Sequence, residues 1–197
     1  MSAKNGRTLT PADLFTLEHY ARTRVAFRAR VLEHKKLRNI AVGPHTTWCF
    51  EDRLTVQYQI QEMLRTERIF EPDAIKEELD SYNPLIPDGT NLKATLLIEY
   101  TDAEQRRIAL ERLKGIEARC WLGVGDERFY AIADEDLERE NETKTSAVHF
   151  LRFELSPPAC SALKAGALAE LGVDHEAYRH QIVTSAAASS SLAGDLA

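Results

Sequence analysis

The sequence has few cysteines and no closely spaced pair of them. Its 197 residues contain three, Cys49, Cys120 and Cys160, and no C-x-x-C motif. Structural zinc and iron–sulfur sites use closely spaced cysteines. We therefore expect no such site built from these three alone, and we interpret each as a small buried apolar residue.

Long hydrophobic runs are also absent. No apolar stretch approaches the roughly 18 residues that a membrane-spanning helix needs. The first fifteen residues, MSAKNGRTLTPADLF, contain no apolar signal core. These two observations predict a cytoplasmic protein that does not enter a membrane.

An excess of positive charge is missing as well, since the formal net charge is −6. Binding to a phosphate backbone needs a basic surface, so the charge argues against a nucleic-acid partner. The motifs G-x-S-x-G and H-E-x-x-H do not occur. GVGD at 123–126 is typical of a hairpin turn, not of a dinucleotide loop. No reaction class is favoured, and whether the chain is an enzyme stays open.

What the sequence does contain is an alternation of helical and strand patterns. Helix formers and capping residues predict helices over about 10–36, 53–70, 72–82, 101–115, 156–171 and 174–182. Alternating apolar residues predict strands over 92–100, 116–124, 128–134 and 146–155. The order indicates an α+β fold, with a helical N-terminal half packed on a mostly antiparallel four-stranded sheet and with C-terminal helices.

These patterns also predict the domain organisation. We expect one domain over 10–183, which has enough residues for a sizeable core. A flexible N-terminus is expected over 1–9. The tail 184–197, which ends in the sequence SAAASSSLAGDLA, is low in complexity and is expected to be disordered.

The segment FEDRLTVQYQIQEMLRTERIF, residues 50–70, fits two structures. Its first half alternates like a strand, whereas its second half is rich in helix formers. We interpret it as a helix from about Arg53 to Phe70, with Asp52 as its N-cap. On a helical wheel, Glu67 then falls in the middle of the apolar arc and Glu62 lies on its flank.

The first predicted helix has the opposite charge on its apolar face. Arg24, Arg28 and Lys35 fall within its stripe of leucine, valine and tyrosine residues. Isolated buried charges are costly, so such groups are paired, hydrated or bound to a ligand. We expect Glu67 to face Arg24 or Arg28, which leaves surplus positive charge in a partly buried place.

Three interpretations of this charge cluster are open. The first is a salt-bridge network that joins two helices. The second is a site between the two helices, in which Arg24, Arg28 and Lys35 bind an anionic group such as a phosphate or carboxylate. The third is that the helical phase is wrong.

His149 lies on the apolar face of the predicted strand 146–155. A single histidine there is more often a hydrogen-bonded core residue than a ligand. If it lay over Glu62 and Glu67, the three side chains could hold iron, manganese or zinc. The candidate metal ligands are therefore Glu62, Glu67 and His149, although their spacing matches no established metal motif.

Three segments of the chain resemble an uncharacterised bacterial family, known only as a domain of unknown function. They are KKLRNIAVGPHTTWCFEDRLTVQYQIQEMLRTERI, EELDSYNPLIPDGTNLKATLLIEY and SAVHFLRFEL, within about residues 10–180. YQIQEMLRTERI is the most specific part. The resemblance implies no catalytic residues. It implies a gene context with rubrerythrin-like proteins and iron–sulfur or flavin oxidoreductases, and hence a link to redox or oxidative-stress metabolism.

Two functions are consistent with these observations. The first is a non-catalytic accessory or interaction protein that works with a redox partner. The alternative is a protein, or an enzyme, that binds a metal or a small anion between the first helix and the helix within residues 50–70. The oligomeric state, and any cofactor, stay open.

Overall fold

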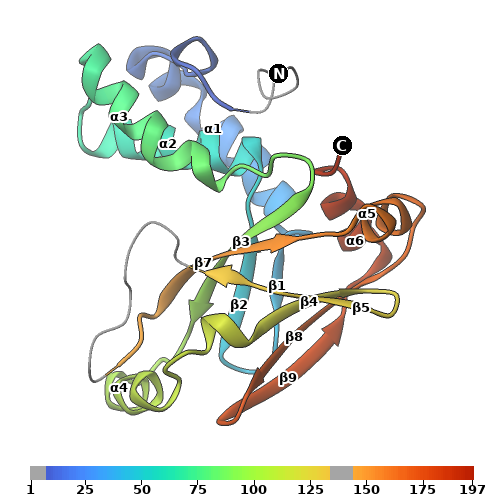
Figure 1. Ribbon diagram of the computed structural model, residues 1–197. Helices are drawn as coiled ribbons and strands as arrows, with labels where there is room; N and C mark the ends of the chain where they lie inside the picture. Colours follow the sequence, from blue (N-terminus) through green and yellow to red (C-terminus); the bar gives the residue numbers. More distant parts are fainter. Residues whose placement is uncertain (1–7, 134–143) are drawn as a thin grey trace.

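The computed structural model describes residues 8–133 and 144–197, and it confirms the α+β class. Helices α1 to α3 lie together at one end of the molecule, and two antiparallel sheets form the rest (Figure 1). This helical layer contains α1 (Leu17–Lys35), α2 (Arg53–Thr66) and α3 (Pro72–Tyr82), with 3-10 turns at Pro11–Asp13 and Asn83–Leu85.

The first sheet has the strand order β1-β2-β3-β7-β6. Its strands are β1 (Asn39–Ala41), β2 (Thr46–Phe50), β3 (Asn91–Ile98), β7 (Val148–Glu154) and β6 (Ile132–Ala133). Every neighbouring pair is antiparallel, and Trp48 on β2 pairs with Leu96 on β3. Strands β3, β7 and β6 coincide with segments that the alternation pattern predicts, whereas β1 and β2 lie outside those segments.

The second sheet has the order β5-β4-β8-β9. Its strands are β5 (Glu127–Tyr130), β4 (Cys120–Val124), β8 (Ala169–His175) and β9 (Tyr178–Val183). The three remaining helices are α4 (Ala103–Arg112), α5 (Pro157–Lys164) and α6 (Ala186–Ala193), and a 3-10 turn spans Glu117–Arg119. The sequence predicted one four-stranded sheet, whereas the described strands form a five-stranded sheet and a four-stranded sheet.

The main hydrophobic core lies between the two sheets. Trp48 and Phe153 stack there with ring centroids 5.4 Å apart, and Leu122 and Leu171 contribute from the second sheet. The helical layer has smaller cores of its own. Ile60 is completely buried in one of them, and Tyr20 in another. In β2 and β7 the buried positions alternate, so each of these strands turns one face toward the main core.

The predicted helix over 174–182 is wrong. Asp174 and His175 end β8, and β9 begins at Tyr178 after a two-residue turn. The Tyr178 hydroxyl donates to the carbonyl of Val42 (2.8 Å) and accepts from the amide of His45 (3.0 Å). The hairpin is favoured because it completes the second sheet and fixes it to the β1–β2 turn.

The prediction of a disordered tail over 184–197 is also wrong. The Ser185 side chain accepts a hydrogen bond from the Ala188 amide and caps α6. Leu192 and Leu196 are buried in the main core. Most of the expected flexible N-terminus, residues 1–7, lies outside the described residues, and Leu9 is buried.

Candidate functional site

The charges predicted between α1 and α2 do form an ion pair, with a different carboxylate. Arg24 donates to both oxygens of Glu62, from Nε at 2.8 Å and from a terminal nitrogen at 2.7 Å. The Tyr20 hydroxyl also donates to Glu62, at 2.5 Å. The hydrogen bonds from Arg24 hold the pKa of Glu62 below its usual range, so the carboxylate is ionised and matched by one cation.

Glu67 is exposed, so the prediction that α2 carries it inward is wrong. It follows the last residue of α2 and forms the C-cap. Arg28 is exposed too, while Lys35 lies 5.9 Å from the ring centroid of Tyr58. Because Glu62 neutralises Arg24, no buried surplus of positive charge results within the described helices. Anion binding by Arg24, Arg28 and Lys35 stays a prediction.

His149 is fully buried in a different part of the fold, at the beginning of β7. Its Nε2 lies 2.9 Å from the Thr145 hydroxyl and 3.0 Å from the carbonyl oxygen of Ser146. A carboxylate oxygen of Glu117 is 3.8 Å away. These contacts match a hydrogen-bonded core histidine. The set Glu62, Glu67 and His149 is not gathered, and no group of three potential ligands occurs among residues 8–133 and 144–197.

A second polar cluster lies where the helical layer meets the sheets, and the sequence analysis missed it. Its centre is Arg38, which is 1% exposed. The guanidinium donates to the carbonyls of Phe50 (3.0 Å) and Glu51 (3.1 Å) and to the carboxylate of Asp195 (2.5 Å). It also donates to the backbone and hydroxyl of Ser191.

Asp52 extends this cluster toward α1. One oxygen accepts from the Thr55 amide and caps α2, as predicted, while the other lies 2.5 Å from His34 Nε2 and 3.6 Å from Arg38 Nε. We name His34, Arg38, Asp52 and Asp195 the Arg38 cluster. No periodicity connects these four residues, because His34 ends a helix, Asp52 begins one, and Asp195 comes from the tail.

The two carboxyl groups of the cluster have opposite pKa shifts. Burial raises the pKa of Asp52, but the Arg38 charge, the Thr55 amide and His34 outweigh burial, and the pKa is lowered. For Asp195, burial outweighs the attraction of Arg38 and raises the pKa to about 6. When the pKa values of two neighbouring carboxyl groups differ, one group can hold a proton at a pH at which the other is ionised.

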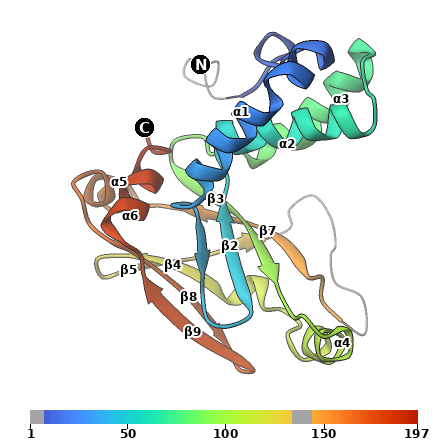
Figure 2. The same ribbon diagram turned by 180° about the vertical axis from the view of Figure 1, so that it is seen from behind.

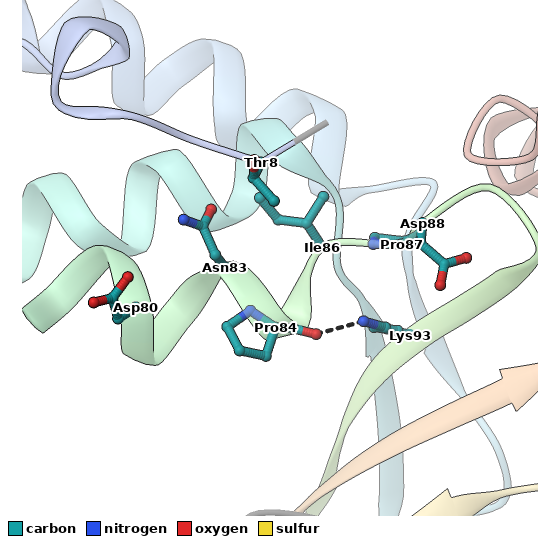
Figure 3. A pocket seen from close by; sticks show the side chains of 8 residues that line it. All are labelled: Thr8, Asp80, Asn83, Pro84, Ile86, Pro87, Asp88 and Lys93. Carbon is teal, nitrogen blue, oxygen red and sulfur yellow. Dashed lines mark hydrogen bonds between the residues drawn. The ribbon is translucent and has the colours of Figure 1, made fainter. Parts of the chain in front are cut away.

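Both carboxyl groups border a surface groove of about 450 Å³, which we call the junction groove. It is lined by Asp52, Arg53, Leu54, Ile86, Pro87, Gly194 and Asp195. A second groove of about 450 Å³ adjoins it across Ile86 and Pro87 (Figure 3). There Lys93 donates to the carbonyl of Pro84 (2.5 Å), and Asn83 holds the backbone of Leu9. Lys93 and Asn83 thus form hydrogen bonds to the backbone of neighbouring segments.

The cysteines give no reactive site. All three are free, Cys120 is fully buried, and burial raises the pKa of the Cys49 thiol to about 11. A thiol with a raised pKa is a poor nucleophile at neutral pH. Among the helices that the structure describes, none is both long and apolar enough to cross a membrane.

Comparison with known proteins identifies a related crystal structure and a protein family. No curated protein matches the chain. A novel protein of unknown function from Burkholderia pseudomallei, known from its crystal structure, is 54% identical, with a TM-score of 0.92. The match covers 96% of this chain and 100% of that one. Residues 8–196 match the family described as Protein of unknown function (DUF3501). The chain therefore belongs to the DUF3501 family.

Proposed function

We propose that this protein is an accessory or interaction protein that acts by binding another protein. The supporting observation is the outer strand of the second sheet. In β9, all five residues after Tyr178 are exposed, including Ile182 (41%) and Val183 (54%). No described strand pairs with its outer edge, and both views place β9 at the boundary of the molecule (Figures 1 and 2).

An unpaired strand edge offers its backbone N–H and C=O groups to an extended segment of a partner. The exposed apolar side chains of β9 would supply contact area. Arg179 on the same strand would favour a partner segment that carries acidic residues. The family resemblance implies the class of the partner, a redox protein such as a rubrerythrin-like, iron–sulfur or flavin protein.

Affinity capture from native extract tests this role. We expect the wild-type protein to enrich one protein of these redox classes, and Ile182→Arg to lose it. Ile108→Arg is the matched control, because Ile108 is similarly exposed (43%) but lies on α4. Capture of chaperones alone, or equal enrichment by both variants, would count against the proposal.

A second candidate function is small-molecule binding in the junction groove. It is supported by the separated pKa values of Asp52 and Asp195 at one groove. Their carboxylates would suit a ligand with a positive charge or with hydrogen-bond donors. The groove is lined by the beginning of α2, by Ile86 and Pro87, and by the segment after α6. It is therefore a different location from the site between the first two helices that the sequence suggested.

Native mass spectrometry tests the second candidate. A bound ligand would appear as extra mass in the purified protein that disappears on denaturation. Asp195→Asn should reduce its occupancy, whereas Asp88→Asn, in the adjoining groove, should not. A native mass equal to the bare chain, or to a clean multiple of it, would argue against a resident ligand.

A further inference from the structure

Helix α1 has an apolar face that no described part of the chain covers. Its inner face buries Tyr20, Phe27 and Val31, while Val25 is 80% exposed and Leu32 44% exposed. Ala21, Val25, Ala29 and Leu32 are all exposed, and their spacing of four, four and three places them on one face. We call this set the α1 stripe. Figure 2 shows α1 at the outside of the helical layer, in front of α2.

The α1 stripe is complementary to itself in size. Along the axis of α1, residue 27 lies midway between Val25 and Ala29. It also lies nearly midway between Ala21 and Leu32. If a second α1 helix ran antiparallel about a twofold axis at that level, each large side chain would face an alanine. Large residues opposite small ones allow two helices to approach closely and interdigitate.

The charges beside the stripe have the same symmetry. Glu18 and Lys36 are equally far from the level of residue 27, and Arg22 and Glu33 are nearly so. All four side chains are more than two-thirds exposed. Among the described residues, their ion pairs are with helix neighbours, Glu18 with Arg22 and Glu33 with Lys36. An antiparallel second copy would place Glu18 near Lys36 and Arg22 near Glu33. A parallel copy would place like charges together.

We propose that the α1 stripe is the interface of a symmetric dimer, in which α1 packs antiparallel against α1 of a second copy of this chain. A C2 interface is self-complementary in this way. The 19 residues of α1 span about 28 Å. One helix face of that length provides less contact than the about 800 Å² per partner of a standard interface. The dimer should therefore be weak and should dissociate on dilution.

Sedimentation velocity of the purified protein over a wide concentration range tests this inference. We expect a reversible monomer–dimer equilibrium, and Val25→Arg should raise its dissociation constant about tenfold or more. Ile108→Arg, on α4, should leave it unchanged. Because Val25 is exposed in the monomer, its replacement should not disturb folding, which circular dichroism would verify.

Charge reversal provides a second, independent readout. Glu18→Lys alone and Lys36→Glu alone should each weaken the dimer, whereas the double variant should restore it. Each reversal breaks a contact within its own helix, so only pairing between copies predicts rescue. A monomer at every concentration, a dimer insensitive to Val25→Arg, or an absence of rescue would each overturn the inference.

This inference goes beyond the proposed function, which uses β9 and a different protein. The sedimentation experiment contains the purified chain alone, so its outcome does not depend on a redox partner. Conversely, Val25→Arg should still capture the partner expected at β9. Failure of one proposal is thereby distinguishable from failure of the other.

Discussion

At the residue scale, the helical wheel identified opposite charges between α1 and α2 but selected the wrong carboxylate. Glu67 has the right angular position, yet it follows the last turn of α2, where it is exposed. Glu62, on the flank, faces Arg24 and Tyr20. A wheel gives direction around a helix axis and contains no information on where along that axis the neighbouring helix crosses.

The two glutamates therefore provide a matched pair of substitutions. Glu62→Gln should lower the free energy of unfolding by about 1–2 kcal/mol, because it removes a charge-assisted pair from a largely buried carboxylate. Glu67→Gln should change it by less than about 0.5 kcal/mol, as is usual for exposed sites. Urea denaturation measures both. Equal effects would contradict the observed pairing.

The Asp195 carboxyl should give stability a specific pH dependence. A pKa raised to about 6 means that the folded state binds the proton more tightly than the unfolded state. Its stabilising contribution is complete below the unfolded pKa of 3.8 and is lost as the pH rises through about 6. Asp195→Asn cannot ionise and should lack this dependence.

Unfolding free energies measured across this pH range would show the effect. When the pH rises from below 3.8 to above 6, the free energy of unfolding of the wild type should fall by about 1–3 kcal/mol relative to that of Asp195→Asn. Parallel pH curves for the two proteins would show that Asp195 is not buried against Arg38 as described.

At the element scale, the sequence predicted most helices and strands but failed over 169–197, where β8 begins inside the predicted helix 156–171. Both failures have one cause, since these residues acquire their structure from distant partners. Tyr178 bonds to the β1–β2 turn, and Leu192 enters the core between the sheets. The serine and alanine composition of the tail does not indicate the capped helix that forms there, in which Ala188, Ser189 and Leu192 are buried.

Helix α6 should consequently contribute to global stability. Leu192→Ala removes a completely buried side chain and should lower the free energy of unfolding by about 2–4 kcal/mol. Ser190→Ala, at an exposed position of the same helix, serves as the control. Chemical denaturation tests the pair, and a Leu192→Ala protein as stable as the control would show that α6 does not pack on the core.

At the scale of the whole molecule, Arg38 connects parts of the fold that have separate hydrophobic cores. It reaches the end of β2, the beginning of α2 and the tail after α6. A buried cation is stable only when its hydrogen-bond acceptors remain in position around it. Unfolding of the helical layer and of the sheets should therefore be coupled through this residue.

Arg38→Met should lower the free energy of unfolding by about 3–5 kcal/mol, because it leaves buried acceptors and carboxylates without their partner. Hydrogen exchange should accelerate both at the beginning of α2 and in α6. Arg30→Met, at an exposed position of α1, is the control. Acceleration confined to only one of the two regions would refute the coupling.

The sequence by itself determined the α+β class, the order of most elements and the presence of opposite charges on α1 and α2. Local propensity and periodicity carry that information, because each depends on residues within a few turns or strand positions. Only the tertiary structure decided that the strands divide into two sheets, that Glu62 is the partner of Arg24, and that Arg38 gathers His34, Asp52 and Asp195. Those contacts join residues up to 157 positions apart, and no local pattern encodes which distant groups meet.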